Sequence, residues 1–337
     1  MSRLARRLHL AQAGREPIVV PEQRILETAL RGKAVRKVRH HLRRMDPVVV
    51  FTPRWSATSQ FLEELSLDLA VGEPLVACRS VNLRPLRGRS RSEAWQFLLH
   101  VFGQVGRRGW VAPPHDPVAD RRGFRVAMEE LLERLHDDST HRVAVLAHGA
   151  EVLDVEMVQD LTEVWMEYAE RHPEGRRCSM LLAGSVEAPW LVLGDAPRLE
   201  LSDFGHAEAA SAIVGRSGPM PMRQLEQIAQ FTGGVPGLVN AVARSVQSDP
   251  SLRIEDGALL ERLGPVADEV RSTLDIITAH DGFCDRLQQL SSGSAMYERE
   301  DVDKPLIMAG LVRRLRVHGE SQVTLRAPAF GELIAER

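Results

Sequence analysis

The sequence predicts an α/β fold, in which a parallel sheet covered by helices on both faces is followed by a helical domain and a small C-terminal domain. Apolar, strand-like segments alternate with helix-like segments over the first two thirds of the chain. The strand-like segments, such as VVVF at 48–51 and RVAVLA at 142–147, are apolar throughout. Continuous apolar strands are typical of parallel sheets buried on both faces. Beyond about residue 205, helical patterns dominate.

The predicted sheet contains five strands, and amphipathic segments between them predict its helices. Gly and Pro indicate a surface loop at 106–120, and residues 1–20 are expected to be weakly structured. The expected strands are 48–51, 75–83, 142–147, 178–183 and 199–201, and the expected helices are 21–45, 56–70, 93–105, 124–136 and 155–170.

The second part of the chain is expected to be a helical lid followed by a winged helix. Two strands joined by a turn at Gly319 predict a hairpin after the last long helices, and helices followed by a hairpin are typical of winged-helix domains. We therefore expect a basic N-terminal segment and helix at 1–45, an α/β domain at 46–204, a lid at 205–279 and a winged helix at 280–337. The expected helices are 206–214, 222–231, 237–248, 258–279, 284–290, 302–309 and 330–335, and the strands are 311–317 and 322–325.

The composition is that of a soluble globular protein, with 44% hydrophobic and 26% charged residues, and we expect the protein to be cytoplasmic. No apolar run approaches the roughly 20 residues that cross a membrane, and the arginine-rich start is not followed by the apolar core of a secretory signal. The three cysteines are far apart and match no metal-site spacing. We therefore expect no membrane association and no metal site.

The charge is distributed unevenly. Residues 1–45 contain twelve Lys or Arg and three Glu, for a net charge of +9, whereas the rest of the chain carries −12. Such a basic run can bind nucleic acid, but apolar residues at four-residue intervals from Leu26 to Leu42 also indicate an ordinary helix whose solvated face is basic. Both interpretations stay open. The predicted hairpin is also basic and includes Arg326. The candidate nucleic-acid contacts from the basic segment and the hairpin are Arg31, Lys33, Arg36, Lys37, Arg39, Arg43, Arg44, Arg313, Arg314 and Arg316.

The segment VVVFTPRWSATS at 48–59 has the layout of a phosphate-binding loop without its key residues. Such loops read G-x-x-x-x-G-K-[ST] between a buried strand and a helix. Thr52 and Ala57 occupy the glycine positions, Thr58 occupies the lysine position, and only Ser59 matches the hydroxyl position. Trp55 also lies inside the loop, where its bulk could fill the nucleotide space. The degenerate loop comprises Thr52, Arg54, Trp55, Ala57, Thr58 and Ser59.

The order of the motifs resembles the AAA+/STAND superfamily of P-loop ATPases, and most closely its origin-recognition-related group. The resemblance covers roughly residues 21–337. A strand at 143–146 stands where the family has its Walker B strand, and LLAGSVEAPWL at 181–191 resembles its sensor-1 region. LELSDFGHAEA at 199–209 resembles the entry to its lid, and the C-terminal part resembles its winged helix. FTGGVPGLVNAVA at 231–243 is similar to its lid motif, with Thr232, Gly233, Gly234 and Pro236.

The resemblance implies nucleotide chemistry that this sequence cannot support in the family's way. The Walker B acids, which support Mg²⁺ and polarise the attacking water, are replaced by Ala147 and His148. A catalytic role for His148 is not expected, because no nucleophile or metal partner accompanies it. We therefore expect no cofactor, no catalytic residue and a pseudo-ATPase rather than an enzyme.

Three functions remain open from the sequence. The first is a scaffold or adaptor in a larger bacterial assembly for defence, transposition or signalling, where an active AAA+ ATPase or an effector would be the protein partner and the chain could form oligomers. The second is a DNA-binding regulator that uses the basic helix and the winged helix. The third is an ATPase with a non-standard P-loop.

Overall fold

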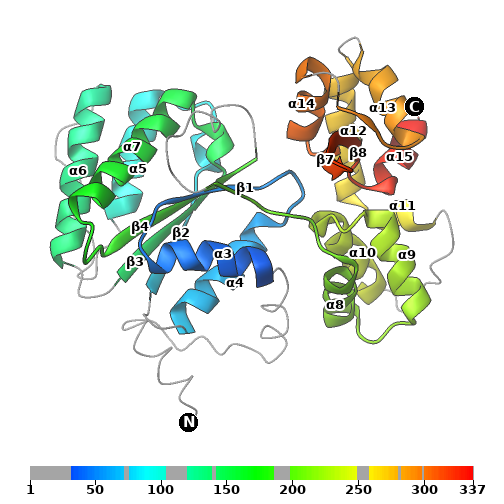
Figure 1. Ribbon diagram of the computed structural model, residues 1–337, viewed down its shortest axis with the longest axis horizontal. Helices are drawn as coiled ribbons and strands as arrows, with labels where there is room; N and C mark the ends of the chain where they lie inside the picture. Colours follow the sequence, from blue (N-terminus) through cyan, green and yellow to red (C-terminus); the bar gives the residue numbers. More distant parts are fainter. Residues whose placement is uncertain are drawn as a thin grey trace. The chain divides into compact units, whose positions relative to one another are not determined.

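The computed structural model describes residues 32–71, 76–103, 120–138, 142–185, 198–248, 258–279, 282–297 and 300–336. The described part of the chain forms two compact units (Figure 1). Unit 1 contains residues 32–52 and 58–201, and unit 2 contains residues 53–57 and 202–336. The middle of the degenerate loop is therefore part of unit 2, although the strand before it and the helix after it belong to unit 1.

Unit 1 is built on a five-stranded parallel sheet, as the sequence predicted. The strand order is β2-β3-β4-β1-β5, and every pair is parallel. β1 lies between β4 and β5, so it is a central strand whose carboxyl end leads into the degenerate loop. The strands are β1 (Val48–Phe51), β2 (Val76–Asn82), β3 (Arg142–His148), β4 (Cys178–Gly184) and β5 (Arg198–Glu200).

Helices cover both faces of this sheet (Figure 1). Val48 and Val50 pack with one hydrophobic cluster, under α3 and α4, whereas Val49 between them packs with the other, under α5, α6 and α7. This division follows from the alternation of side chains along a strand and explains why the strands are apolar throughout. The helices are α3 (Gly32–Arg43), α4 (Thr58–Val71), α5 (Arg91–Gly103), α6 (Arg121–Asp138) and α7 (Val155–Arg171), with short 3-10 helices η1 (Arg84–Leu86) and η2 (Ala150–Val152).

Several sequence predictions fall wholly or partly outside the described residues. These are the weak structure of residues 1–20, the first part of the helix expected at 21–45, most of the loop expected at 106–120, and residues 186–191 of the sensor-1 resemblance. The described part of the first helix ends at Arg43, close to the expected end.

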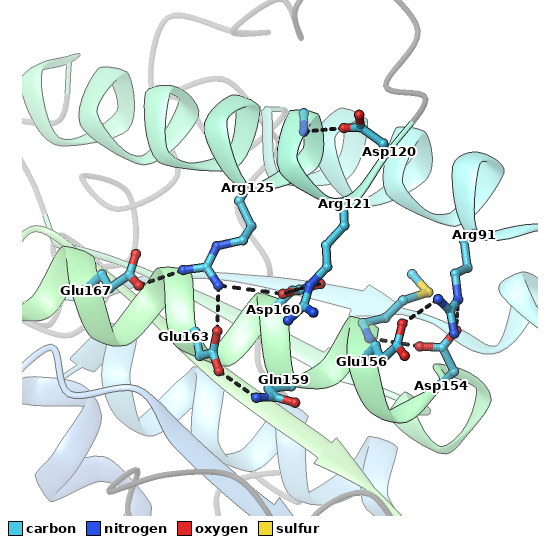
Figure 2. A network of polar contacts seen from close by, with 12 residues as sticks. Arg91, Asp120, Arg121, Arg125, Asp154, Glu156, Gln159, Asp160, Glu163 and Glu167 are labelled. Carbon is cyan, nitrogen blue, oxygen red and sulfur yellow. Dashed lines mark hydrogen bonds and ion pairs between the residues drawn. The ribbon is translucent and has the colours of Figure 1, made fainter.

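Ion pairs link α6 to α7 in unit 1 (Figure 2). Arg121 contacts the buried carboxylate of Asp160 at 2.7 Å, and Arg125 reaches Glu163 and Glu167, both at 2.6 Å. Burial raises the pKa of the Asp160 carboxyl, although its hydrogen bond with Arg121 opposes the shift. Acidic residues spaced three and four apart on α7 lie on one face of the helix, which is why one arginine can contact several of them. We interpret this network as structural.

Unit 2 combines the predicted lid helices with the predicted hairpin around one hydrophobic cluster. Ile228 and Val242 from the lid helices and Leu306 and Phe330 from the C-terminal region belong to that cluster. The division into lid and winged-helix domains at residue 280 stays a prediction. The helices are α8 (His206–Ser217), α9 (Met222–Thr232), α10 (Pro236–Ser248), α11 (Ala258–Arg262), α12 (Pro265–Thr278), α13 (Phe283–Ser291), α14 (Glu300–Met308) and α15 (Pro328–Ala335).

The predicted hairpin is confirmed. β7 (Val312–Val317) pairs with β8 (Glu320–Leu325) in antiparallel register, and the short strand β6 (Ala295–Met296), which the sequence analysis missed, pairs with the other side of β8. The prediction of one helix over 258–279 is wrong, because the helix is interrupted between α11 and α12. Gly264 there has a φ of +50°, and Pro265 begins the next helix, so the backbone cannot continue the first one.

Candidate functional site

The degenerate loop has the strand–loop–helix layout that the sequence predicted. Thr52 follows β1 and donates its backbone N–H to the carbonyl of Gly184 at 2.9 Å. Thr58 and Ser59 begin α4. Between them, Trp55 and Ala57 adopt left-handed backbone conformations, with φ of +59° and +49°. This conformation costs a non-glycine residue roughly 1–2 kcal/mol, so surrounding contacts must hold the loop in it.

The guanidinium of Arg326 holds this loop within unit 2. Arg326 follows β8 and is only 3% exposed. Its Nη1 donates to the carbonyl oxygen of Arg54 at 2.5 Å, and its Nη2 donates to the hydroxyl of Ser56 at 3.2 Å. Its Nε and Nη2 donate to the carboxylate of Asp203 at 2.9 and 2.5 Å, and Nη1 also contacts the carbonyl of Gly310 at 3.4 Å. We call Arg326, Asp203, Arg54 and Ser56 the Arg326 network.

Further contacts fix the loop to the helices of unit 2. The backbone N–H of Gly237 on α10 donates to the carbonyl of Trp55 at 2.6 Å. The Trp55 ring lies 5.3 Å from the ring of Phe330 on α15, between centroids. Arg54 donates from Nη1 to the hydroxyl of Thr273 on α12 at 2.9 Å. Gly237 has to be glycine, because a Cβ there would lie 2.8 Å from Trp55 Cβ.

The lid motif shapes the surroundings of Arg326. Gly233 ends α9 in a left-handed conformation, as the sequence indicated, and Pro236 begins α10. A Cβ on Gly233 would lie 2.3 Å from the carbonyl oxygen of Arg326, and a Cβ on Gly234 would lie 2.1 Å from that of Phe204. The hydroxyl of Thr232 is buried and donates to the carbonyl of Ile228. The glycines therefore permit the close backbone approach that places Asp203 and Arg326 together.

The end of β3 carries no carboxylate, and the polar residues around it are tied to one another. Ala147 is buried, and His148 is half-buried. Burial, reinforced by the charge of Arg84, lowers the pKa of His148 and favours its neutral form. Glu151, the first carboxylate after the strand, lies 3.6 Å from Arg84 and accepts from the backbone N–H of Ser185 at 3.3 Å. Within the described ranges, no group of three His, Cys, Asp or Glu is arranged to hold a metal ion.

The candidate nucleic-acid contacts are divided between the two units and differ in their surroundings. Arg36 and Lys37 are exposed on α3 of unit 1, whereas Arg39 on the same helix is paired with Asp68 at 3.1 Å. Arg44 lies 3.3 Å from Asp46, and Arg43 is partly buried. Arg31 lies outside the described residues, as does the side chain of Lys33.

The hairpin arginines belong to unit 2 and differ in their surroundings. Arg313 and Arg316 are exposed. Arg314 lies over the Tyr297 ring at 4.4 Å and donates to the hydroxyl of Ser321. Arg326, which the sequence suggested as part of a basic hairpin surface, is buried and therefore unavailable to nucleic acid. Nothing in the local sequence distinguishes Arg326 from the hairpin arginines, because its hydrogen-bond acceptors come from the distant residues 54, 56, 203 and 310.

Comparisons with known proteins identify the fold. No protein-family model matches the chain, and no curated protein matches it in sequence. Among solved structures, the Walker-type ATPase PABY2304 of Pyrococcus abyssi is 13% identical over 90% of this chain and 95% of its own, with a TM-score of 0.60. The ORC2 protein of Aeropyrum pernix is 13% identical over 97% and 96%, with a TM-score of 0.46. A STAND protein of Pyrococcus horikoshii is 13% identical over 89% of this chain and 42% of its own, with a TM-score of 0.45.

The fold is therefore that of a Walker-type P-loop ATPase, as the order of the AAA+ motifs predicted. At such low identity the similarity carries the fold alone and leaves the activity open. In the described part of the chain, no helix is both long enough and apolar enough to cross a membrane.

Proposed function

We propose that this protein is a P-loop ATPase-like scaffold that neither binds nor hydrolyses nucleotide and that acts by holding protein partners. The observation that carries the proposal is the engagement of the degenerate loop by Arg326. A phosphate-binding loop offers backbone N–H groups and a lysine to an anion. Here the loop offers the carbonyl of Arg54 and the hydroxyl of Ser56 to a cation of the same chain.

Nucleotide binding at this loop would require the contacts of unit 2 to be broken. A phosphate needs the loop to present donors, whereas the carbonyls of Arg54 and Trp55 are already used as acceptors. Displacing the Arg326 guanidinium would leave the largely buried Asp203 carboxylate without its partner. Breaking a buried ion pair costs about 3–5 kcal/mol. A nucleotide would have to overcome this cost although the loop has no lysine to bind its phosphates.

The proposal also rests on the absence of the residues that ATP hydrolysis would need. Ala147 stands where the family's Mg²⁺-supporting carboxylate would be, and His148 stands where its catalytic glutamate would be. Glu151 is engaged by Arg84 and Ser185. We therefore propose that the protein is a scaffold or adaptor of a cytoplasmic assembly in bacteria, for defence, transposition or signalling. Its partner would be an active AAA+ ATPase or an effector, and the chain could also form oligomers.

Thermal unfolding with ATP–Mg²⁺ tests this proposal against an ATPase with a non-standard loop. At 1 mM nucleotide, a site with a dissociation constant of about 10 μM would stabilise the protein by about 2.7 kcal/mol. We expect no stabilisation for the native chain, and none for Thr58→Lys, which restores only the lysine. ADP and magnesium alone serve as ligand controls. Stabilisation of the native chain by ATP–Mg²⁺ would overturn the pseudo-ATPase proposal.

DNA binding is a second candidate, favoured by the exposed Arg36 and Lys37 on α3. Contacts with phosphates release counterions, so affinity should fall steeply with salt. If α3 contacts duplex DNA, Arg36→Ala should reduce the salt slope by about one. Arg122→Ala, an exposed arginine on α6, removes the same charge elsewhere on unit 1 and should leave the slope unchanged. Equal effects of the two variants, or no binding at low salt, would exclude this role for α3.

A further inference from the structure

Unit 2 contains a cavity that the Arg326 network does not use. Its volume is about 430 Å³, and its lining comes from the start of α8, the end of α9, the lid glycines, β7 and α15. Phe204, Ala209 and Pro328 give it apolar walls, whereas His206 and Arg313 provide polar groups. A concave site with apolar walls and a few polar groups is the usual form of a binding pocket.

The electrostatic character of this cavity is basic. None of its described lining residues is acidic. Arg313 is exposed, and no hydrogen bond or ion pair to it is found among the described residues. Arg314, next to it in β7, is by contrast engaged with Tyr297 and Ser321. The cavity therefore has an available guanidinium beside apolar walls, a combination that suits a carboxylate next to an apolar group.

The cavity lies at one end of an edge strand. In the sheet order β6-β8-β7, β7 has a partner on one side only. Because side chains alternate along a strand, Arg313, Leu315 and Val317 lie on one face, and the latter two are partly exposed. Edge strands can accept an extended peptide through their free backbone groups, while pockets for alternate side chains give specificity.

We infer that the β7 edge and this cavity bind an extended acidic peptide of a partner protein. One carboxylate of the peptide pairs with Arg313, an apolar side chain enters the cavity between Phe204 and Pro328, and the peptide backbone adds to β7. The charge of β7 supports an acidic occupant, because the strand carries Arg313, Arg314 and Arg316 and no acidic residue. This inference rests on the proposed scaffold function and identifies the kind of partner that the scaffold would hold.

Fluorescence anisotropy with a labelled synthetic peptide tests the inference on the full chain. The probe is an extended peptide of about eight residues that places one glutamate and one leucine two positions apart, with threonine at the other positions, so that both side chains lie on the same face of the added strand. We expect saturable binding, weakened about tenfold or more by Arg313→Glu, since a charge-assisted hydrogen bond is lost and a repulsion is added. Arg316→Glu changes the same charge on the opposite face of the same strand and should alter the affinity less than about threefold.

A second variant separates the cavity from the charge. Gln230→Trp places a large ring at an exposed position of the cavity lining without changing the charge, and it should also weaken binding about tenfold. Equal effects of Arg313→Glu and Arg316→Glu on peptide affinity would overturn the inference. So would binding of duplex DNA as tight as that of the peptide, if the same variants also abolish DNA binding. Absence of peptide binding while ATP–Mg²⁺ also fails to bind would refute the peptide site and leave the pseudo-ATPase proposal intact.

Discussion

Replacement of Arg326 by methionine is expected to lower the free energy of unfolding of unit 2 by about 3–5 kcal/mol. Methionine keeps much of the side-chain length but leaves the Asp203 carboxylate, which is only 13% exposed, without its cation. The carbonyl of Arg54 and the hydroxyl of Ser56 also lose their donor. Hydrogen exchange measured by mass spectrometry can follow unit 2 separately from unit 1, and the loss of protection should be greatest in the peptides around residues 53–57, 203 and 326.

A matched control for this prediction lies in the same unit. Arg271 forms an ion pair with Glu336 at 3.1 Å, but both side chains are more than 40% exposed. Arg271→Met should therefore destabilise the protein much less than Arg326→Met, because exposed ion pairs contribute little to stability. Asp203→Asn combined with Arg326→Met should recover part of the lost stability, because the unpaired buried charge is removed. If Arg326→Met is no more harmful than Arg271→Met, the Arg326 network does not hold the loop.

Replacement of Gly234 by alanine is expected to destabilise the protein by at least about 3 kcal/mol, at the upper end of single substitutions. The added Cβ would lie 2.1 Å from the carbonyl oxygen of Phe204, and the residue has a φ of +75°. The clash involves backbone on both sides, because Phe204 donates its N–H to the carbonyl of Gly234 at 2.9 Å. Relief of the clash would move the segment that carries Asp203. Urea unfolding followed by far-UV circular dichroism measures the loss.

Gly218→Ala provides the control that separates strain from steric clash. Gly218 has a φ of +81°, but nothing lies within 4 Å of a Cβ built on it. With a ψ of −175° its backbone lies in a region that is strained for any residue with a Cβ, so its replacement should cost that strain alone, about 1–3 kcal/mol. An effect of Gly234→Ala as small as that of Gly218→Ala would mean that the approach of Gly234 to Phe204 does not matter for the fold.

The architecture of both units was largely predictable from the sequence. Continuous apolar runs predicted the parallel sheet, because a strand buried on both faces needs apolar side chains at every position. The hairpin at residues 312–325 followed from two short strand patterns around Gly319. The break at Gly264 was missed, because the apolar periodicity of α11 and α12 runs across it and the helical spacing alone gives no boundary.

Only part of the candidate site could be predicted from the sequence. The predicted absence of the loop glycines, the lysine and the Walker B acids rests on single positions, so it could be inferred directly from residues 52–59 and 147–148. The edge position of β7 beside a cavity required the strand order and the packing of the lid glycines.

By itself, the sequence determined most of the secondary structure and the type of fold, and it predicted the loss of the phosphate-binding and metal-supporting side chains. Local periodicity and residue type carry that information. Only the tertiary structure decided what the degenerate loop contacts instead. Arg54 and Arg326 are 272 residues apart in the chain, and the hydrogen bond between them exists because Gly233, Gly237 and Gly310 allow close backbone approach. A pairing over such a distance leaves no local pattern, since its two partners are brought together by the packing of unit 2.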